Sequence, residues 1–195
     1  MAGVTPSQTV GPYFSFGLDP KGRYDWVQTV GNDLVTADAT GERILIEGRV
    51  LDGDGAPVND AMLEIWQADA AGRYAHPADQ RRPNAQFKGF GRAGTDADGG
   101  FAFSTIKPGC VAGPDGKPQA PHILVAVFSR GMVRHLYTRL YFEDEKTNAG
   151  DPILALVPAE RRATLIAKRQ DKDGRVAYRF DIRLQGENET VFFDI

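Results

Sequence analysis

Tyr74 and His122 are the pair of side chains in this sequence that remains as a candidate for holding a metal ion, because His76 and His135 lack any spacing to a second ligand. A phenolate is a hard anionic ligand and imidazole suits iron, so the pair would favour ferric iron. His122 follows a loop rich in glycine and proline and opens an apolar run, and side chains at such loop mouths often build sites. Two donors alone do not retain an iron ion, so a structural role for the pair is the favoured interpretation at this point.

Arg130 is a third candidate, placed just beyond the apolar run that His122 opens. Its planar guanidinium offers paired donors that match a carboxylate. A salt bridge to an acidic neighbour is the simpler reading from composition alone.

Alternating apolar and polar residues predict the strands that would position these side chains. Residues 44–50, 101–105 and 176–184 alternate with a period of two. The run 122–128 is apolar at every position after His122, which is typical of a strand covered on both faces. Further strands are expected at 61–66, 134–142 and 190–193.

The remaining segments are expected to be loops, apart from a short helix at 158–168 that begins with proline. The stretch 67–94 is predicted as one long loop. Its end, Gly89 to Gly94, has the glycine spacing of the dinucleotide-binding fingerprint. A turn and a strand are expected after it instead of the required helix, so the fingerprint is rejected. Many short strands separated by turns indicate an all-β protein, specifically an antiparallel β-sandwich with irregular loops and one short helix.

Two parts of the chain differ in character. Residues 1–43 are expected to form an N-terminal arm and an irregular segment that pack on the core or on a partner, since they are apolar yet unsuited to regular structure. Residues 44–195 are expected to form the β-sandwich domain.

Composition excludes several classes of function. The net charge is −3, so the chain lacks the positive charge that is typical of nucleic-acid-binding proteins. No apolar run is long enough to span a membrane. Cys110 is the only cysteine, so no internal disulfide can form. Together with the absence of a signal-peptide pattern, this leads us to expect a cytoplasmic location.

Several motifs resemble the intradiol ring-cleavage dioxygenases over nearly the whole chain. They are Ile46–Val58, Leu63–Asp69, Gly72–Tyr74, Thr105–Gly109, Ala120–Ile123 and Leu140–Phe142. The segments Thr5–Tyr13, Ser129–Gly131, Tyr178–Ile182 and Gly186–Asp194 are similar to one kind of subunit in this family, an α subunit whose β partner carries the iron. The resemblance implies that the holoenzyme uses Fe(III) to cleave an aromatic ring with O2.

The family's iron ligands are two tyrosines and two histidines, and only half of them have a counterpart here. Tyr74 matches the first tyrosine and His122 the first histidine, whereas the other two positions fall at Val111 and Leu124. Neither of these side chains can donate to a metal, and an apolar side chain disfavours a cation. We therefore expect a vestigial site, with no catalytic residue and no metal in this chain and with the iron bound by the β subunit.

The resemblance also implies which residues of this chain would touch the substrate at the interface of an αβ protomer in a larger oligomer. These are Thr9, Gly11, Pro12, Tyr13 and Arg130. The expected partners are thus the β subunit and a small aromatic substrate, with no nucleic acid and no membrane. Two alternatives remain: a self-sufficient intradiol dioxygenase with altered ligands, and a transthyretin-like binding or carrier module that shares the strand–turn–strand pattern of residues 44–66.

Overall fold

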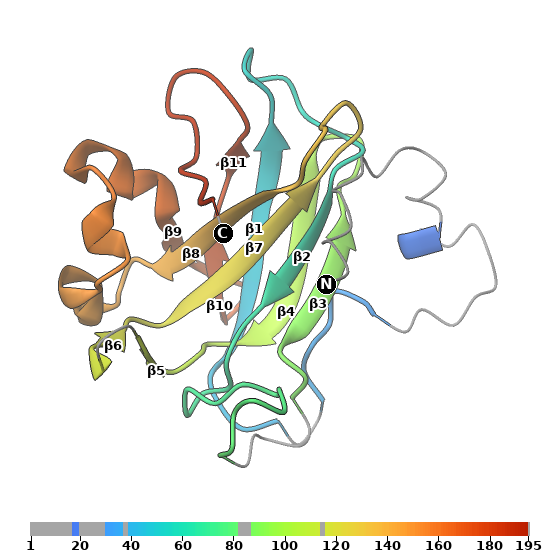
Figure 1. Ribbon diagram of the computed structural model, residues 1–195. Coiled ribbons are helices and arrows are strands. Elements are labelled where there is room, and N and C mark those ends of the chain that lie inside the picture. The colour runs from blue at the N-terminus through green and yellow to red at the C-terminus, as the bar shows by residue number, and fades with distance from the viewer. Residues whose placement is uncertain (1–16, 20–29, 37–38, 82–86, 114–115, 195) are drawn as a thin grey trace, which may run out of the picture.

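The computed structural model describes residues 17–19, 30–36, 39–81, 87–113 and 116–194. Within these residues the protein is built mostly of strands, with short 3-10 helices gathered on one side (Figure 1). Four of the candidate residues, Thr9, Gly11, Pro12 and Tyr13, lie outside the described residues.

The elements follow one another along the chain. The strands are β1 (Arg43–Leu51), β2 (Met62–Trp66), β3 (Phe90–Gly94), β4 (Gly100–Ile106), β5 (Val111–Ala112), β6 (Pro118–Gln119), β7 (His122–Phe128), β8 (Leu136–Phe142), β9 (Ile166–Lys172), β10 (Arg175–Arg179) and β11 (Ile182–Arg183). The 3-10 helices η2 (Lys146–Gly150), η3 (Leu154–Leu156) and η4 (Ala159–Leu165) lie between β8 and β9.

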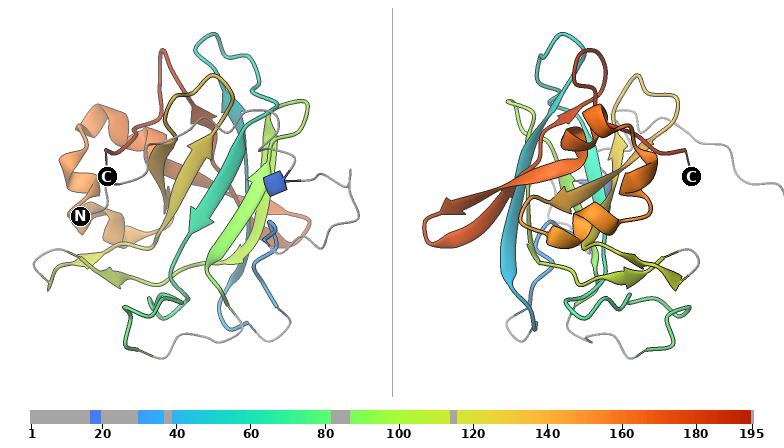
Figure 2. Two further views of the ribbon diagram at one scale, coloured as in Figure 1. Left: turned by 45° about the vertical axis from the view of Figure 1, so that its right-hand side comes forward. Right: turned by 90° about the vertical axis from the view of Figure 1, so that its left-hand side faces the viewer.

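All these strands except β5 and β6 belong to one curved sheet, in the order β11-β1-β10-β9-β8-β7-β2-β3, with β4 paired to β1 (Figure 2). The prediction of an all-β protein is confirmed, but the antiparallel sandwich is corrected to a mixed, nearly closed sheet. The pairs β1–β10, β1–β11 and β8–β9 run parallel. Parallel neighbours need a crossover rather than a tight turn, and the chain through η2–η4 supplies it for β8 and β9.

A segment before β1 joins the two ends of the sheet. The Gly31 carbonyl accepts from the Arg92 N–H of β3, and the Asn32 carbonyl accepts from the Ser104 N–H of β4, both at 2.9 Å. Leu34 donates to the Ser104 carbonyl and is buried. The described part of the predicted irregular segment therefore packs on the core, while the domain boundary at residue 43 stays a prediction.

The core fills the inside of this curved sheet. On β7 the inward side chains Ile123, Val125 and Val127 are buried, as the apolar run predicts. On its other face His122 and Ala126 are also buried, whereas Leu124 and Phe128 are only half-buried, so that face is covered in part.

Several predicted elements differ from the structure, and the strand predicted at 176–184 is divided into β10 and β11. The predicted loop 67–94 ends in β3, because glycines weaken the strand pattern without preventing the strand. The predicted helix 158–168 is the 3-10 helix η4, and its last residues already belong to β9. The predicted strand 190–193 makes one isolated bridge, between Phe193 and Tyr137.

Candidate functional site

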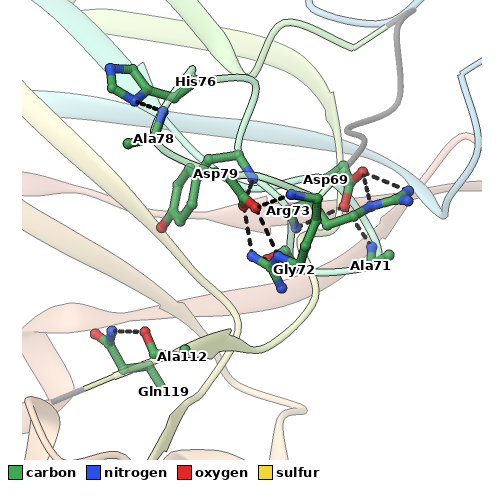
Figure 3. A network of polar contacts seen from close by, with 11 residues as sticks. Asp69, Ala71, Gly72, Arg73, His76, Ala78, Asp79, Ala112 and Gln119 are labelled. Carbon is green, nitrogen blue, oxygen red and sulfur yellow. Dashed lines mark hydrogen bonds and ion pairs between the residues drawn. The ribbon is translucent and has the colours of Figure 1, made fainter. Parts of the chain in front are cut away.

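Tyr74 lies on the loop after β2, which two aspartates hold in shape. Asp69 Oδ1 accepts from the backbone N–H groups of Ala71 and Arg73, each at 2.9 Å, and Asp69 Oδ2 accepts from Arg73 Nε at 2.9 Å (Figure 3). Asp79 Oδ2 accepts from the Tyr74 N–H at 2.9 Å. Short polar side chains that bond nearby backbone groups are the usual way to fix such a loop, so Tyr74 leaves from a defined backbone.

The Tyr74 ring packs on the last residue of β2. Its centroid lies 5.8 Å from that of Trp66, with the rings nearly parallel at 15°. Burial raises the pKa of the Tyr74 phenol above its usual value, although the positive charge of Arg139 opposes this. The phenol is therefore neutral near pH 7. An open hollow of about 730 Å³ lies beside it and is lined by Trp66, Asp79, Arg81 and Ala112 among others.

His122 begins β7 at the same end of the sheet and is buried. Its Nδ1 lies 2.7 Å from the Ala120 carbonyl oxygen, and since a carbonyl only accepts, Nδ1 carries the proton. Burial lowers the pKa of the imidazole, and the charge of Arg139 lowers it further. His122 is thus neutral near pH 7, with the lone pair on Nε2.

The other two positions at which the family resemblance places iron ligands lie on strands near these side chains. Val111 is buried in β5 and pairs with Gln119 of β6. Leu124 pairs with Trp66 of β2 on one side and with Arg139 of β8 on the other. The structure therefore brings the four positions to one end of the sheet, where two of them have no donor atom.

Arg139 lies near Tyr74 and His122, since its positive charge acts on both, and its role was not predicted from the sequence. Its Nη1 donates to Gln119 Oε1 at 2.6 Å and lies 3.4 Å from the Tyr141 hydroxyl oxygen. Residues 134–142 are correctly predicted to hold a strand, but a strand pattern alone does not say which residue faces which across the sheet. Only the register shows that Arg139 lies opposite Leu124.

Asp151 fixes the backbone just before His122 and the hydroxyl of Tyr141. Its Oδ2 accepts from the Ala120 N–H at 2.8 Å, and its Oδ1 accepts from the Tyr141 hydroxyl at 3.1 Å. Oδ1 also accepts from the N–H groups of Ile153 and Leu154 at 2.9 and 2.7 Å. Burial raises the pKa of the Tyr141 phenol, which therefore stays protonated and donates to the carboxylate. Asp151 thereby ties the start of β7 to η3.

Arg130 lies far from this pocket. It follows β7, whose first residue is His122, so the two residues stand at opposite ends of the strand. Arg130 Nε pairs with Asp60 Oδ2 at 2.6 Å, and the side chain is 69% exposed. The structure thus contains the salt bridge that composition alone favours, and it does not bring Arg130 together with Tyr74 and His122.

Comparison with known proteins identifies the family of this chain. A family model described as "Dioxygenase" matches residues 11–186. The protocatechuate 3,4-dioxygenase alpha chain of Burkholderia cepacia is 51% identical over 98% of this chain and 97% of that protein. The beta chain from the same organism is 39% identical over 82% of this chain and 71% of that protein.

The chain belongs to the intradiol dioxygenase family. The dioxygenase domain of a carbohydrate-binding fusion protein from Streptomyces sp. SirexAA-E has a similar structure, with a TM-score of 0.62 and 26% identity over 93% of this chain and 98% of that domain. The family predicted from the motifs is confirmed. Its match over nearly the whole chain favours a dioxygenase over a carrier module. None of the helices formed by the described residues has both the length and the apolar character needed to cross a membrane.

Intradiol dioxygenases depend on iron, and the residues of this pocket do not fit that ion. Tyr74 and His122 offer two donors, whereas Val111 and Leu124 offer none. Among the described residues, no three His, Cys, Asp or Glu side chains come close enough to share a metal ion. The guanidinium of Arg139, hydrogen-bonded in the pocket, is itself a permanent cation. The donor set is thus too small for a structural or catalytic iron centre.

Proposed function

We propose that this chain is the α subunit of a protocatechuate 3,4-dioxygenase and that an iron-bearing β subunit completes the enzyme. The enzyme adds both atoms of O2 to protocatechuate and opens the ring between the two hydroxyl-bearing carbons, giving 3-carboxy-cis,cis-muconate. The observation that carries the proposal is the 51% identity to an alpha chain over 98% of this chain, combined with two missing donors at the family's ligand positions.

The β subunit supplies Fe(III), and with it the activation of the bound catechol toward O2. An αβ protomer, assembled into a larger oligomer, places the substrate at the interface. A separate beta chain that is 39% identical to this chain supports such a division of labour. The cytoplasm, expected from the single cysteine, remains the proposed location.

Arg130 is the residue of this chain that we assign to the substrate carboxylate, together with Thr9, Gly11, Pro12 and Tyr13 of the arm. Arg130 lies away from Tyr74 and His122, and this position is compatible with the role. The proposed substrate site lies at the interface with the β subunit, so it need not coincide with the iron-ligand positions of this chain. Asp60 engages Nε and thereby orients the guanidinium. The two terminal nitrogens then remain for a carboxylate of the substrate.

The test is the kinetics of Arg130→Ala in the intact αβ enzyme. A charge-assisted contact contributes about 1.5–3 kcal/mol, so kcat/KM for protocatechuate should fall about tenfold to a hundredfold. Plain catechol lacks the carboxylate, and its turnover should change much less. Arg134→Ala is the matched control, because Arg134 is also exposed and pairs with Asp194.

The Arg130→Ala and Arg134→Ala enzymes must first be shown to form the same αβ assembly as the wild type. An equal loss for protocatechuate and catechol would assign Arg130 to structure, and no loss for either would remove it from the substrate site. The identity of the chain as an α subunit would survive either result, since it rests on different observations.

A further inference from the structure

The four vestigial positions are linked to one another through Arg139. Leu124 faces Arg139 directly across the β7–β8 pair, and Leu124 also faces Trp66, whose ring stacks on Tyr74. Val111 pairs with Gln119, whose side-chain oxygen accepts from Arg139 Nη1 at 2.6 Å.

His122 completes this arrangement. It pairs with Tyr141, with ring centroids 5.7 Å apart, and the Tyr141 hydroxyl lies 3.4 Å from Arg139 Nη1. Arg139 therefore contacts Gln119, which pairs with Val111, and Tyr141, which pairs with His122. It also lies opposite Leu124, whose other neighbour, Trp66, stacks on Tyr74. The positive charge of Arg139 also acts on the two candidate donors themselves, Tyr74 and His122.

The charge of Arg139 is held in place and is not neutralised by an ion pair from the described part of the chain. Its contacts there are an amide oxygen and a phenol, both uncharged. Asp151, the carboxylate behind Tyr141, already accepts hydrogen bonds from three backbone N–H groups and the Tyr141 hydroxyl. The side chain is half-buried, so water screens its charge less than at an open surface.

We propose that Arg139 has taken the place of the metal cation in this pocket and that its positive charge, in addition to the missing donors, excludes ferric iron. A fixed positive charge repels a trivalent ion across the few ångströms of a ligand shell. Arg139 also donates to Gln119 of β6, which connects β8 to the β5–β6 ribbon. Restoring a donor would therefore not restore iron unless this charge is removed as well. The inference concerns the isolated chain and does not depend on the proposed αβ enzyme.

The experiment restores one donor with and without the arginine. Leu124→His adds an imidazole two residues from His122 on the same face of β7, giving three donors with Tyr74. The single variant and the double variant Leu124→His/Arg139→Gln are each titrated with ferric nitrilotriacetate. The readouts are the visible absorption of an iron–phenolate bond and the iron retained after desalting, with circular dichroism to verify folding.

The double variant should bind iron at least about tenfold more tightly than Leu124→His alone. Leu124→His/Arg139→Lys keeps a positive charge and should remain as poor a binder as the single variant. Leu124→His/Arg134→Gln removes an equal charge from an exposed residue and should also match the single variant.

Three results would overturn the proposal. Equal iron affinity in the single and the Arg139→Gln double variant would show that Arg139 does not matter. Failure of both to bind would show that the missing donors alone exclude iron. Iron binding by the Arg139→Lys variant equal to that of the Arg139→Gln variant would show that the charge is not the cause.

Discussion

Asp151 accepts four hydrogen bonds although only 1% of it is exposed. Asp151→Asn replaces one acceptor oxygen by an amino group and leaves a buried N–H or hydroxyl without a partner. Hydrogen bonds to charged groups contribute about 1.5–3 kcal/mol, so we expect the free energy of unfolding to fall by about 2 kcal/mol or more. Urea unfolding measures it. Asp194→Asn, at an exposed ion pair, should change it by less than about 0.5 kcal/mol.

His122 makes stability depend on pH in a predictable direction. Its pKa in the folded protein is lowered from the ordinary value of 6.5, mainly by burial. The unfolded chain therefore takes up the proton first, and the contribution of His122 is present above that value and lost as the pH falls toward the lowered pKa.

We expect His122→Gln to flatten the decline of the unfolding temperature between about pH 7.5 and about pH 5.5. A slope that is identical in the wild type and in His122→Gln would show that the imidazole does not titrate with folding.

At the scale of single residues, the sequence shows which side chains could bind a metal ion, but it does not show what surrounds them in the fold. Tyr74 and His122 could be singled out because their donor atoms are rare in such a pattern. The role of Arg139 could not, because an arginine in a predicted strand is ordinary until the strand register shows what faces it.

At the scale of elements, the strand predicted at 176–184 is divided into β10 and β11 where the chain crosses β1 closely. Phe180 donates to the Glu47 carbonyl at 2.8 Å, and Asp181 Oδ1 accepts from the Arg49 N–H at 2.9 Å. At Gly48 a Cβ would lie 1.8 Å from the Phe180 carbonyl oxygen. Alternation predicts residues 176–184 correctly as extended chain, but it carries no signal for this close crossing.

Gly48→Ala should therefore be strongly destabilising, because the contact is with backbone that cannot rotate away. Overpacking costs about 1–3 kcal/mol, and we expect the upper part of this range. Gly150→Ala is the control, since nothing lies within 4 Å of a Cβ there. Equal unfolding midpoints for the two variants would contradict the close crossing of β1 and Phe180.

The parallel pairs are the other feature of the fold that local patterns do not predict. Apolar periodicity marks strands but not their direction, so β8 and β9 could not be recognised as parallel neighbours. The start of β9 was also not predicted. The predicted helix 158–168 includes the first residues of β9, which begins directly after η4.

At the scale of the whole molecule, two separate groups of residues in this chain are expected to have different roles. The vestigial pocket, with Tyr74, His122 and Arg139, lies at one end of β7, and Arg130 lies beyond the other end. The first is expected to bind no metal, and the second is proposed to meet the substrate with the β subunit. The family was predictable because its motifs extend over nearly the whole chain.

The central claim is that iron belongs to the β subunit and not to this chain. The most direct test is the iron content, by elemental analysis, of this chain purified alone and of the complex co-purified with its β subunit. We predict a colourless isolated chain with far less than one iron per molecule, and a coloured complex with about one ferric iron per αβ pair, as a single complete ligand set requires. About one tightly held iron in the isolated chain would contradict the account.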